Sequence, residues 1–189
     1  MALTAIGLCN RALLKIGASP INSFDDGAVE AEIAGALYSP NRDALLSAHS
    51  WSFASTQMIL PRLVNVPIAD YAYAFQLPSD FLRSLSAGAS GRGRGLEYRI
   101  TGRMLHCNSE TVTLSYLFRP NETDFPAFFD QALIARLAAE FCTPLTESTS
   151  RTTALYQIAD NEFRRARLID SQQDTRVGFE DFSLIEARR

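Results

Sequence analysis

The sequence has few of the residues that carry metal or disulfide chemistry: three cysteines and two histidines among 189 residues. Cys9, Cys107 and Cys142 are odd in number, widely spaced and form no CxxC pair, which favours buried apolar thiols in a reducing compartment over a disulfide framework. His49 and His106 have no carboxylate at ligand spacing, and His106-Cys107 supplies only half of the four ligands that zinc needs. We therefore expect structural histidines and no metal or other cofactor.

Long apolar runs and a strong excess of positive charge are also missing. No segment approaches the roughly 18 apolar residues of a membrane span, and Asn10, Arg11 and Lys15 interrupt the apolar N-terminus, which predicts a domain helix there rather than a targeting segment. The net charge of -3 argues against nucleic-acid binding driven by phosphate neutralisation. A hydrophobic content of 47% is typical of one globular domain.

Lysine is nearly absent, since Lys15 is the only one among 18 basic residues. Arginine suits planar pairing with carboxylates at interfaces. The same bias also arises from genomic base composition, and the sequence leaves both explanations open.

Catalytic motifs are missing as well. There is no GxSxG, and neither histidine can be tied to a serine or cysteine nucleophile. Asp25-Asp26-Gly27 lacks the alternating acids of an EF-hand and is interpreted as a turn before the next helix. Paired acids such as Glu30 and Glu32 are typical of solvated faces. We therefore expect that the protein is not an enzyme. A catalytic pair of carboxylates distant in the sequence could still come together in the folded chain.

Helical periodicity marks both ends of the chain. The first helix is expected from an N-cap at Thr4 to Ile16, with Gly17 as its stop. A second is expected over 28–49, where Pro40 either kinks the helix or begins a new one. The last two are expected over 124–142, with Asp124 as N-cap and Thr143-Pro144 as its end, and over 150–169. The apolar positions of the second helix are Val29, Ile33, Leu37, Leu45 and Leu46. The positions of the last helix predicted to face inward are Leu155, Ile158, Ala159, Phe163, Ala166 and Ile169.

The middle of the chain has the character of β-structure. Extended segments are expected at 54–60 and 72–77, and a short strand or a turn at 81–85. A hairpin of 94–101 and 104–107 is expected around Gly102-Arg103. Residues 111–119 alternate as a half-buried strand does. The sequence thus predicts an α+β fold: a mainly α-helical bundle (1–70 and 120–170), a central antiparallel β-rich insert (71–119) and an extended C-terminal arm (171–189).

A glycine–arginine loop lies in this insert at 90–95. No GK[ST] follows its glycines and no helix opens there, so it is no phosphate loop. It is either a flexible basic loop that touches a phosphate backbone or an acidic partner, or a solvated tip between strands. The candidate contacts to a partner or to DNA are Arg92 and Arg94, with Arg99 and Arg103 expected at the same basic end.

The C-terminal arm is polar but carries apolar residues near its end. A solvated tail seldom contains four of them within seven residues. The arm either packs on its own domain or inserts into a partner, as extended arms with apolar anchors do; we favour the partner. The anchors would be Phe179, Phe182, Leu184 and Ile185.

The order of these segments resembles that of the head-to-tail adaptor proteins of tailed bacteriophages, specifically the tail tubular protein A (gatekeeper) family of short-tailed phages. The likeness is carried by a first helix followed by IGASPINSFDDG, a second helix that runs into HSWSFA, the insert with YAFQLPSDFLR and YRITGRMLHCN, and the helix pair FPAFFDQALIARLAAEFCTPLTES and ALYQIADNEFRRARLID. The glycine–arginine loop and the arm have no counterpart in this resemblance.

The resemblance implies a structural role in the virion tail, after assembly in the host cytoplasm. Twelve copies would form a ring below the portal protein, with the bundle on the portal and on neighbouring subunits. The β-insert would face the tail nozzle, a tail tubular protein B-like component. Viral DNA would pass through the ring without sequence-specific binding, and neither a cofactor nor a membrane partner is implied.

Two other classes stay open from the residues alone. One is an envelope polysaccharide hydrolase whose carboxylates the sequence does not reveal. The other is a small nucleic-acid binder that uses the first two helices as a helix-turn-helix. The long turn between Ile16 and Ala28 and the shortage of basic residues disfavour the binder.

Overall fold

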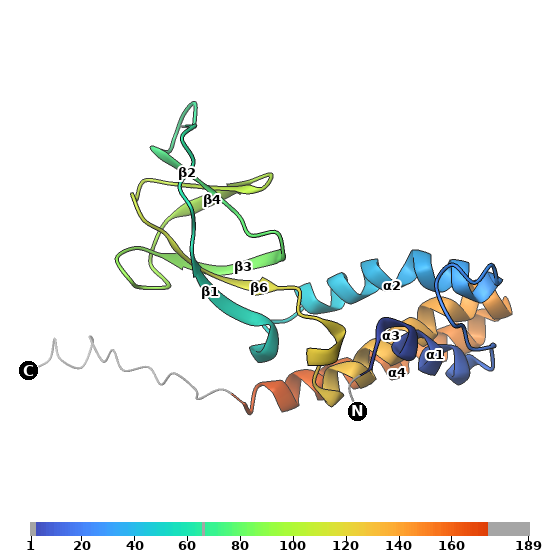
Figure 1. Ribbon diagram of the computed structural model, residues 1–189. Coiled ribbons are helices and arrows are strands. Elements are labelled where there is room, and N and C mark those ends of the chain that lie inside the picture. Colours follow the sequence, from blue (N-terminus) through green and yellow to red (C-terminus); the bar gives the residue numbers. More distant parts are fainter. Residues whose placement is uncertain (1–2, 66, 174–189) are drawn as a thin grey trace, which may run out of the picture.

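The computed structural model describes residues 3–65 and 67–173, which form four α-helices and two three-stranded antiparallel sheets. The helices pack side by side, and the sheets form a lobe that stands on one end of this bundle (Figure 1). The predicted α+β fold is confirmed. The predicted arm anchors Phe179, Phe182, Leu184 and Ile185 lie outside the described residues.

Helix α1 (Ala5–Ile16) has the two ends that its sequence predicts. The Thr4 hydroxyl accepts a hydrogen bond from the N–H of Gly7 at 3.1 Å, and Gly17 ends the helix with φ 78°. Leu8, Ala12 and Leu13 are buried on one face.

Helix α2 (Val29–Ser47) continues through Pro40 as one element. Its buried residues are Ala31, Ala34, Tyr38 and Leu46. Val29, one of the apolar positions of the expected helix, is 61% exposed. It occupies the first helical position, whereas the buried stripe starts at Ala31.

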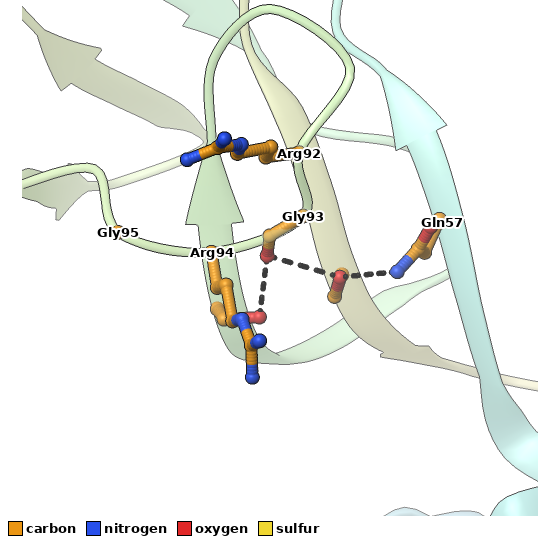
Figure 2. Close-up of a pocket in the computed structure, with 7 residues that line it drawn as sticks. Gln57, Arg92, Gly93, Arg94 and Gly95 are labelled. Carbon is orange, nitrogen blue, oxygen red and sulfur yellow. Dashed lines mark hydrogen bonds between the residues drawn. The ribbon is translucent and has the colours of Figure 1, made fainter. Parts of the chain in front are cut away.

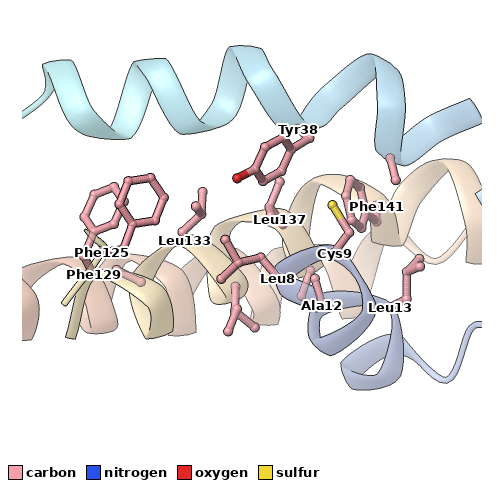
Figure 3. Close-up of a cluster of buried hydrophobic side chains, with 14 of the residues drawn as sticks. Leu8, Cys9, Ala12, Leu13, Tyr38, Phe125, Phe129, Leu133, Leu137 and Phe141 are labelled. Carbon is pink, nitrogen blue, oxygen red and sulfur yellow. The ribbon is translucent and has the colours of Figure 1, made fainter. Parts of the chain in front are cut away.

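Helix α3 (Ala127–Thr146) is the centre of the bundle, with ten buried residues against the other helices (Figure 3). The predicted N-cap, Asp124, instead belongs to the short 3-10 helix η2 (Glu122–Asp124), and Pro126 caps α3 without a side-chain hydrogen bond. The predicted end at Thr143-Pro144 is also wrong. The helix runs one turn further, with the Thr146 hydroxyl bonded to the Cys142 carbonyl at 2.7 Å.

Helix α4 (Thr149–Asp170) packs mainly on α3. Ala159 and Ala166 are fully buried, and Phe163 is half-buried. Ile158, predicted to face inward, is 48% exposed because one neighbouring helix covers only a narrow stripe of α4. That prediction is wrong.

The lobe contains one sheet in the order β1-β6-β3 and another in the order β2-β5-β4. The strands are β1 (Ser55–Ile59), β2 (Tyr73–Gln76), β3 (Phe81–Gly88), β4 (Tyr98–Thr101), β5 (Met104–Cys107) and β6 (Thr113–Phe118). The predicted hairpin is the β4–β5 pair. Because β1 pairs with β6, the strand structure begins at Ser55, ahead of residue 71 where the insert was expected to start.

Strand β6 joins the two parts of the molecule. Leu114 and Tyr116 belong to the apolar core of the lobe, while Leu117 belongs to the core of the bundle. The predicted half-buried alternation is therefore wrong, since residues 114–117 are all buried. Both faces of this strand are covered.

Candidate interaction surface

The glycine–arginine loop folds back against the β1-β6-β3 sheet (Figure 2). The Gly93 carbonyl accepts hydrogen bonds from the Ser86 hydroxyl at 2.7 Å and the Ser115 hydroxyl at 3.4 Å. The Gln57 side-chain amide in turn donates to Ser115 Oγ at 3.1 Å. Side chains from all three strands thus hold the middle of the loop in place.

Two glycines permit this close approach. A Cβ at Gly88 would lie 2.0 Å from the Arg92 carbonyl oxygen, and one at Gly93 would lie 2.8 Å from the Gln57 amide nitrogen. A side chain at Gly88 would force the backbone to move, and one at Gly93 would displace the side chains of Gln57 and Ser115. The glycines therefore serve the packing of the loop on the sheet as well as its turn.

The four predicted loop arginines do not gather at one end. Arg92 and Arg94 flank Gly93, are exposed, and make no ion pair within the described part of the chain. Arg99 pairs with Asp70 at 3.6 Å in solvent. Arg103 donates to the Pro78 carbonyl, just ahead of β3, whereas the loop follows the end of β3.

Strand β3 separates these two places. Its eight residues span roughly 20 Å at the usual rise of a strand. The structure thus keeps Arg92 and Arg94 as an exposed pair and places Arg103 elsewhere on the lobe.

A polar hollow extends from the loop to the end of α4. Gln57 and Ser115 line it on the lobe side, and Ser171 and Gln173 line it on the helix side. At its floor lies Asp170, which is 3% exposed. The Asp170 carboxylate accepts hydrogen bonds from the Ser52 N–H at 3.1 Å and from the Ser52 hydroxyl at 2.6 Å.

His49 also faces this carboxylate, with Nε2 3.5 Å from Asp170. Burial and the positive charge of Arg167 lower the pKa of His49. Since the Ser52 hydroxyl donates to the carboxylate rather than to the imidazole, the trio lacks the serine–histidine contact that activates a nucleophile. It is a junction between α4 and the start of the lobe. Sequence reasoning missed it because the bonded residues are 118 positions apart.

Arginine and carboxylate side chains form a network between α2 and the segment after β6. Arg42 contacts Asp43 at 2.9 Å and Glu122 at 2.8 Å, Arg119 also pairs with Asp43, and the Tyr38 hydroxyl donates to Glu122 at 3.1 Å. Burial acts to raise the pKa of Asp43, but hydrogen bonds from Arg119 and Arg42 outweigh it, so the pKa is lowered. Burial also acts to raise the pKa of Glu122, but hydrogen bonds from its own backbone N–H, from Arg42 and from Tyr38 lower it. These carboxylates are kept ionised, unlike the acid of a glycosidase pair.

Apolar side chains are exposed at the far end of the lobe. Val64 is 96% exposed and Ile68 is fully exposed, both in the connection from β1 to β2, which reaches the apex of the lobe away from the bundle (Figure 1). The bundle exposes a second set: Leu14, Val29, Ile158 and Leu168. Exposed apolar side chains on both the lobe and the bundle suit contacts with more than one partner.

Across 3–65 and 67–173, no three histidine, cysteine or acidic side chains are grouped so as to hold a metal ion. None of the helices described combines the length and apolar character needed to cross a bilayer.

The sequence matches no protein-family model and no curated protein.

Proposed function

We propose that this protein is a head-to-tail adaptor of a short-tailed phage, a structural ring of twelve copies between the portal and the tail nozzle. One observation supports it most: a helical bundle and a β-lobe share strand β6, and both parts carry exposed apolar residues. A connector needs a contact surface for each partner on one rigid body. Viral DNA passes through the ring without sequence-specific binding.

The bundle contacts the portal and the neighbouring subunits in this proposal. Leu14, Ile158 and Leu168 are exposed on its helices and are available for such contacts. The arm residues Phe179, Phe182, Leu184 and Ile185 anchor on the portal or on a neighbour.

The lobe apex docks the nozzle. Val64 and Ile68 supply the apolar contact there. Arg92 and Arg94, held on the sheet without ion pairs in the described chain, add a contact to the nozzle or to passing DNA. Two arginines per subunit and a net charge of -3 keep any grip on DNA weak, as a conduit requires.

Electron microscopy of the protein alone and mixed with the portal tests the proposal. A ring with twelve-fold symmetry on the portal is expected, while free protein stays monomeric until the portal supplies a template. A mixture in which the chain never joins the portal would refute the adaptor role.

A truncated chain tests the arm. The truncation must keep Asp170, because this carboxylate bonds Ser52; a chain that ends at Gln173 meets this condition. It should fold and lose portal binding. The full-length variant Val64→Asp with Ile68→Asp is the matched control, expected to bind the portal and to lose the nozzle.

A further inference from the structure

Strand β1 has an open edge. It stands first in the order β1-β6-β3, and within residues 3–65 and 67–173 no segment pairs with its other side. The Leu60 N–H bonds the Val112 carbonyl, so in this antiparallel ladder residues 56 and 58 point their backbone groups at β6. The N–H and C=O groups of Gln57 and Ile59 therefore point outward.

The other strand edges of the lobe are protected. Residues 61–63 cover β2, with the Leu63 N–H bonded to the Ala74 carbonyl. Two register shifts interrupt β3, and β4 is short and bears Arg99. Bulges, covering segments and charges are the devices by which proteins guard sheet edges.

Strand β1 has none of these devices. Its sequence STQMI contains no charge and no proline, and its register with β6 is regular. Met58 is 43% exposed and Ile59 71% exposed. An edge that is regular, uncharged and open invites an added strand.

The chain's own C-terminal segment starts beside this edge. Ser171 and Gln173 line the same hollow as Ser55 and Gln57. Sixteen residues follow Gln173, and the first five can span about 17 Å when extended. Residues 179–185, FEDFSLI, are rich in strand-forming apolar residues and come within reach of β1.

We propose that residues 179–185 add to the open edge of β1 of the same molecule before assembly. Their backbone pairs with Gln57 and Ile59, and their apolar side chains cover Met58 and Ile59. The docked arm then prevents two copies from pairing through β1. It dissociates from β1 when it binds a partner. This docking goes beyond the ring proposal and does not depend on it.

Amide hydrogen exchange in the full-length monomer tests the docking. The Gln57 and Ile59 amides should be protected, and Leu184→Asp should speed their exchange by at least about tenfold. The Met58 amide, which bonds β6, should not change. Ala187→Asp introduces the same charge outside the docking segment and should leave all three amides as they are. Rapid exchange of Gln57 and Ile59 in the unaltered chain, or no effect of Leu184→Asp, would overturn the proposal.

A dilution series separates the arm of the same molecule from that of another copy. Protection of the Gln57 and Ile59 amides should not change when protein at a concentration on the order of micromolar is diluted about a hundredfold. A tethered segment binds at an effective concentration that does not depend on the protein concentration. Protection that fades on dilution would overturn docking within one molecule. Neither outcome bears on the electron microscopy of the ring, so either proposal can be refuted without refuting the other.

Discussion

Asp170, the last residue of α4, accepts hydrogen bonds from both the N–H and the hydroxyl of Ser52, the first residue of the 3-10 helix η1 (Ser52–Ala54). Strand β1 follows η1 directly. The contact therefore fixes the end of the bundle's last helix to the point where the lobe begins. Together with β6, it is a second connection between the two parts.

Asp170→Ala should lower the free energy of unfolding by about 2–3 kcal/mol, because it removes a buried carboxylate that accepts charge-assisted hydrogen bonds from Ser52. Asp160→Ala is the matched control: it lies on the same helix, is exposed, and should change stability by less than about 0.5 kcal/mol. Urea denaturation measures both. Equal losses in the two variants would contradict a structural role for the Asp170 contact.

Gly88→Ala should displace the glycine–arginine loop. The new Cβ would meet the Arg92 carbonyl oxygen at 2.0 Å, so the loop must lift from the sheet, at a cost of about 1–3 kcal/mol. Trypsin should then cut after Arg92 and Arg94 faster than in the unaltered protein.

The control for this experiment is Gly35→Ala in α2. Its Cβ would meet Phe24 only at ordinary contact distances, the nearest 3.6 Å. Alanine also favours a helix over glycine, so stability should rise by about 0.5–1 kcal/mol and trypsin cleavage should stay slow. A Gly88→Ala protein with unchanged cleavage would show that the loop is not held by the sheet.

Features set by neighbouring residues could be predicted from the sequence. The ends of α1 depend on Thr4 and Gly17, each within a turn of the groups it satisfies. The β4–β5 hairpin likewise depends on Gly102, whose φ is 58°. Local chemistry decides such elements, so the sequence is sufficient.

Features set by distant residues could not be predicted. The alternation of β6 indicates one buried face, yet the bundle covers the second face at Leu117. The loop at 90–95 was foreseen as a loop, but its place on the sheet depends on Gln57, Ser86 and Ser115 from three separate strands. No local pattern carries this information.

Arg42→Gln should lower the free energy of unfolding at neutral pH. The lowered pKa values of Asp43 and Glu122 mean that their ionised forms stabilise the fold above about pH 4 and that this contribution is lost as the pH falls through the folded-state values. Without Arg42 we expect a loss of about 1–2 kcal/mol at pH 7, which shrinks toward pH 2. Urea denaturation across this range measures it.

Arg94→Gln is the control for this pH dependence. Arg94 is exposed and has no ion pair in the part of the chain described, so its removal should leave the stability–pH curve unchanged. If the stability lost in Arg42→Gln were equally large at every pH, Asp43 and Glu122 would not be the partners of Arg42.

Asp130→Asn should raise the stability of the protein at neutral pH, whereas Arg42→Gln lowers it. Burial raises the pKa of Asp130 to about 6, and one carboxylate oxygen is buried without a hydrogen-bond partner. The folded state therefore holds a proton that the unfolded chain releases near pH 4, so stability falls as the pH rises from about 4 to about 6. The amide removes this penalty. We expect a gain of about 1 kcal/mol at pH 7 and none at pH 3; a loss at pH 7 would contradict the burial argument.

Two leucines of β6 test whether the lobe and the bundle unfold together. Leu114 lies in the core of the lobe and Leu117 in the core of the bundle, and both are fully buried. Each change to alanine should cost about 2–5 kcal/mol. Because one strand serves both cores, either variant should shift the Trp51 fluorescence transition and the hydrogen exchange of the lobe amides by the same free energy. If Leu114→Ala destabilised the lobe amides and left the Trp51 transition unchanged, the two parts would be independent, and the molecule would lack the rigidity that a connector between two partners requires.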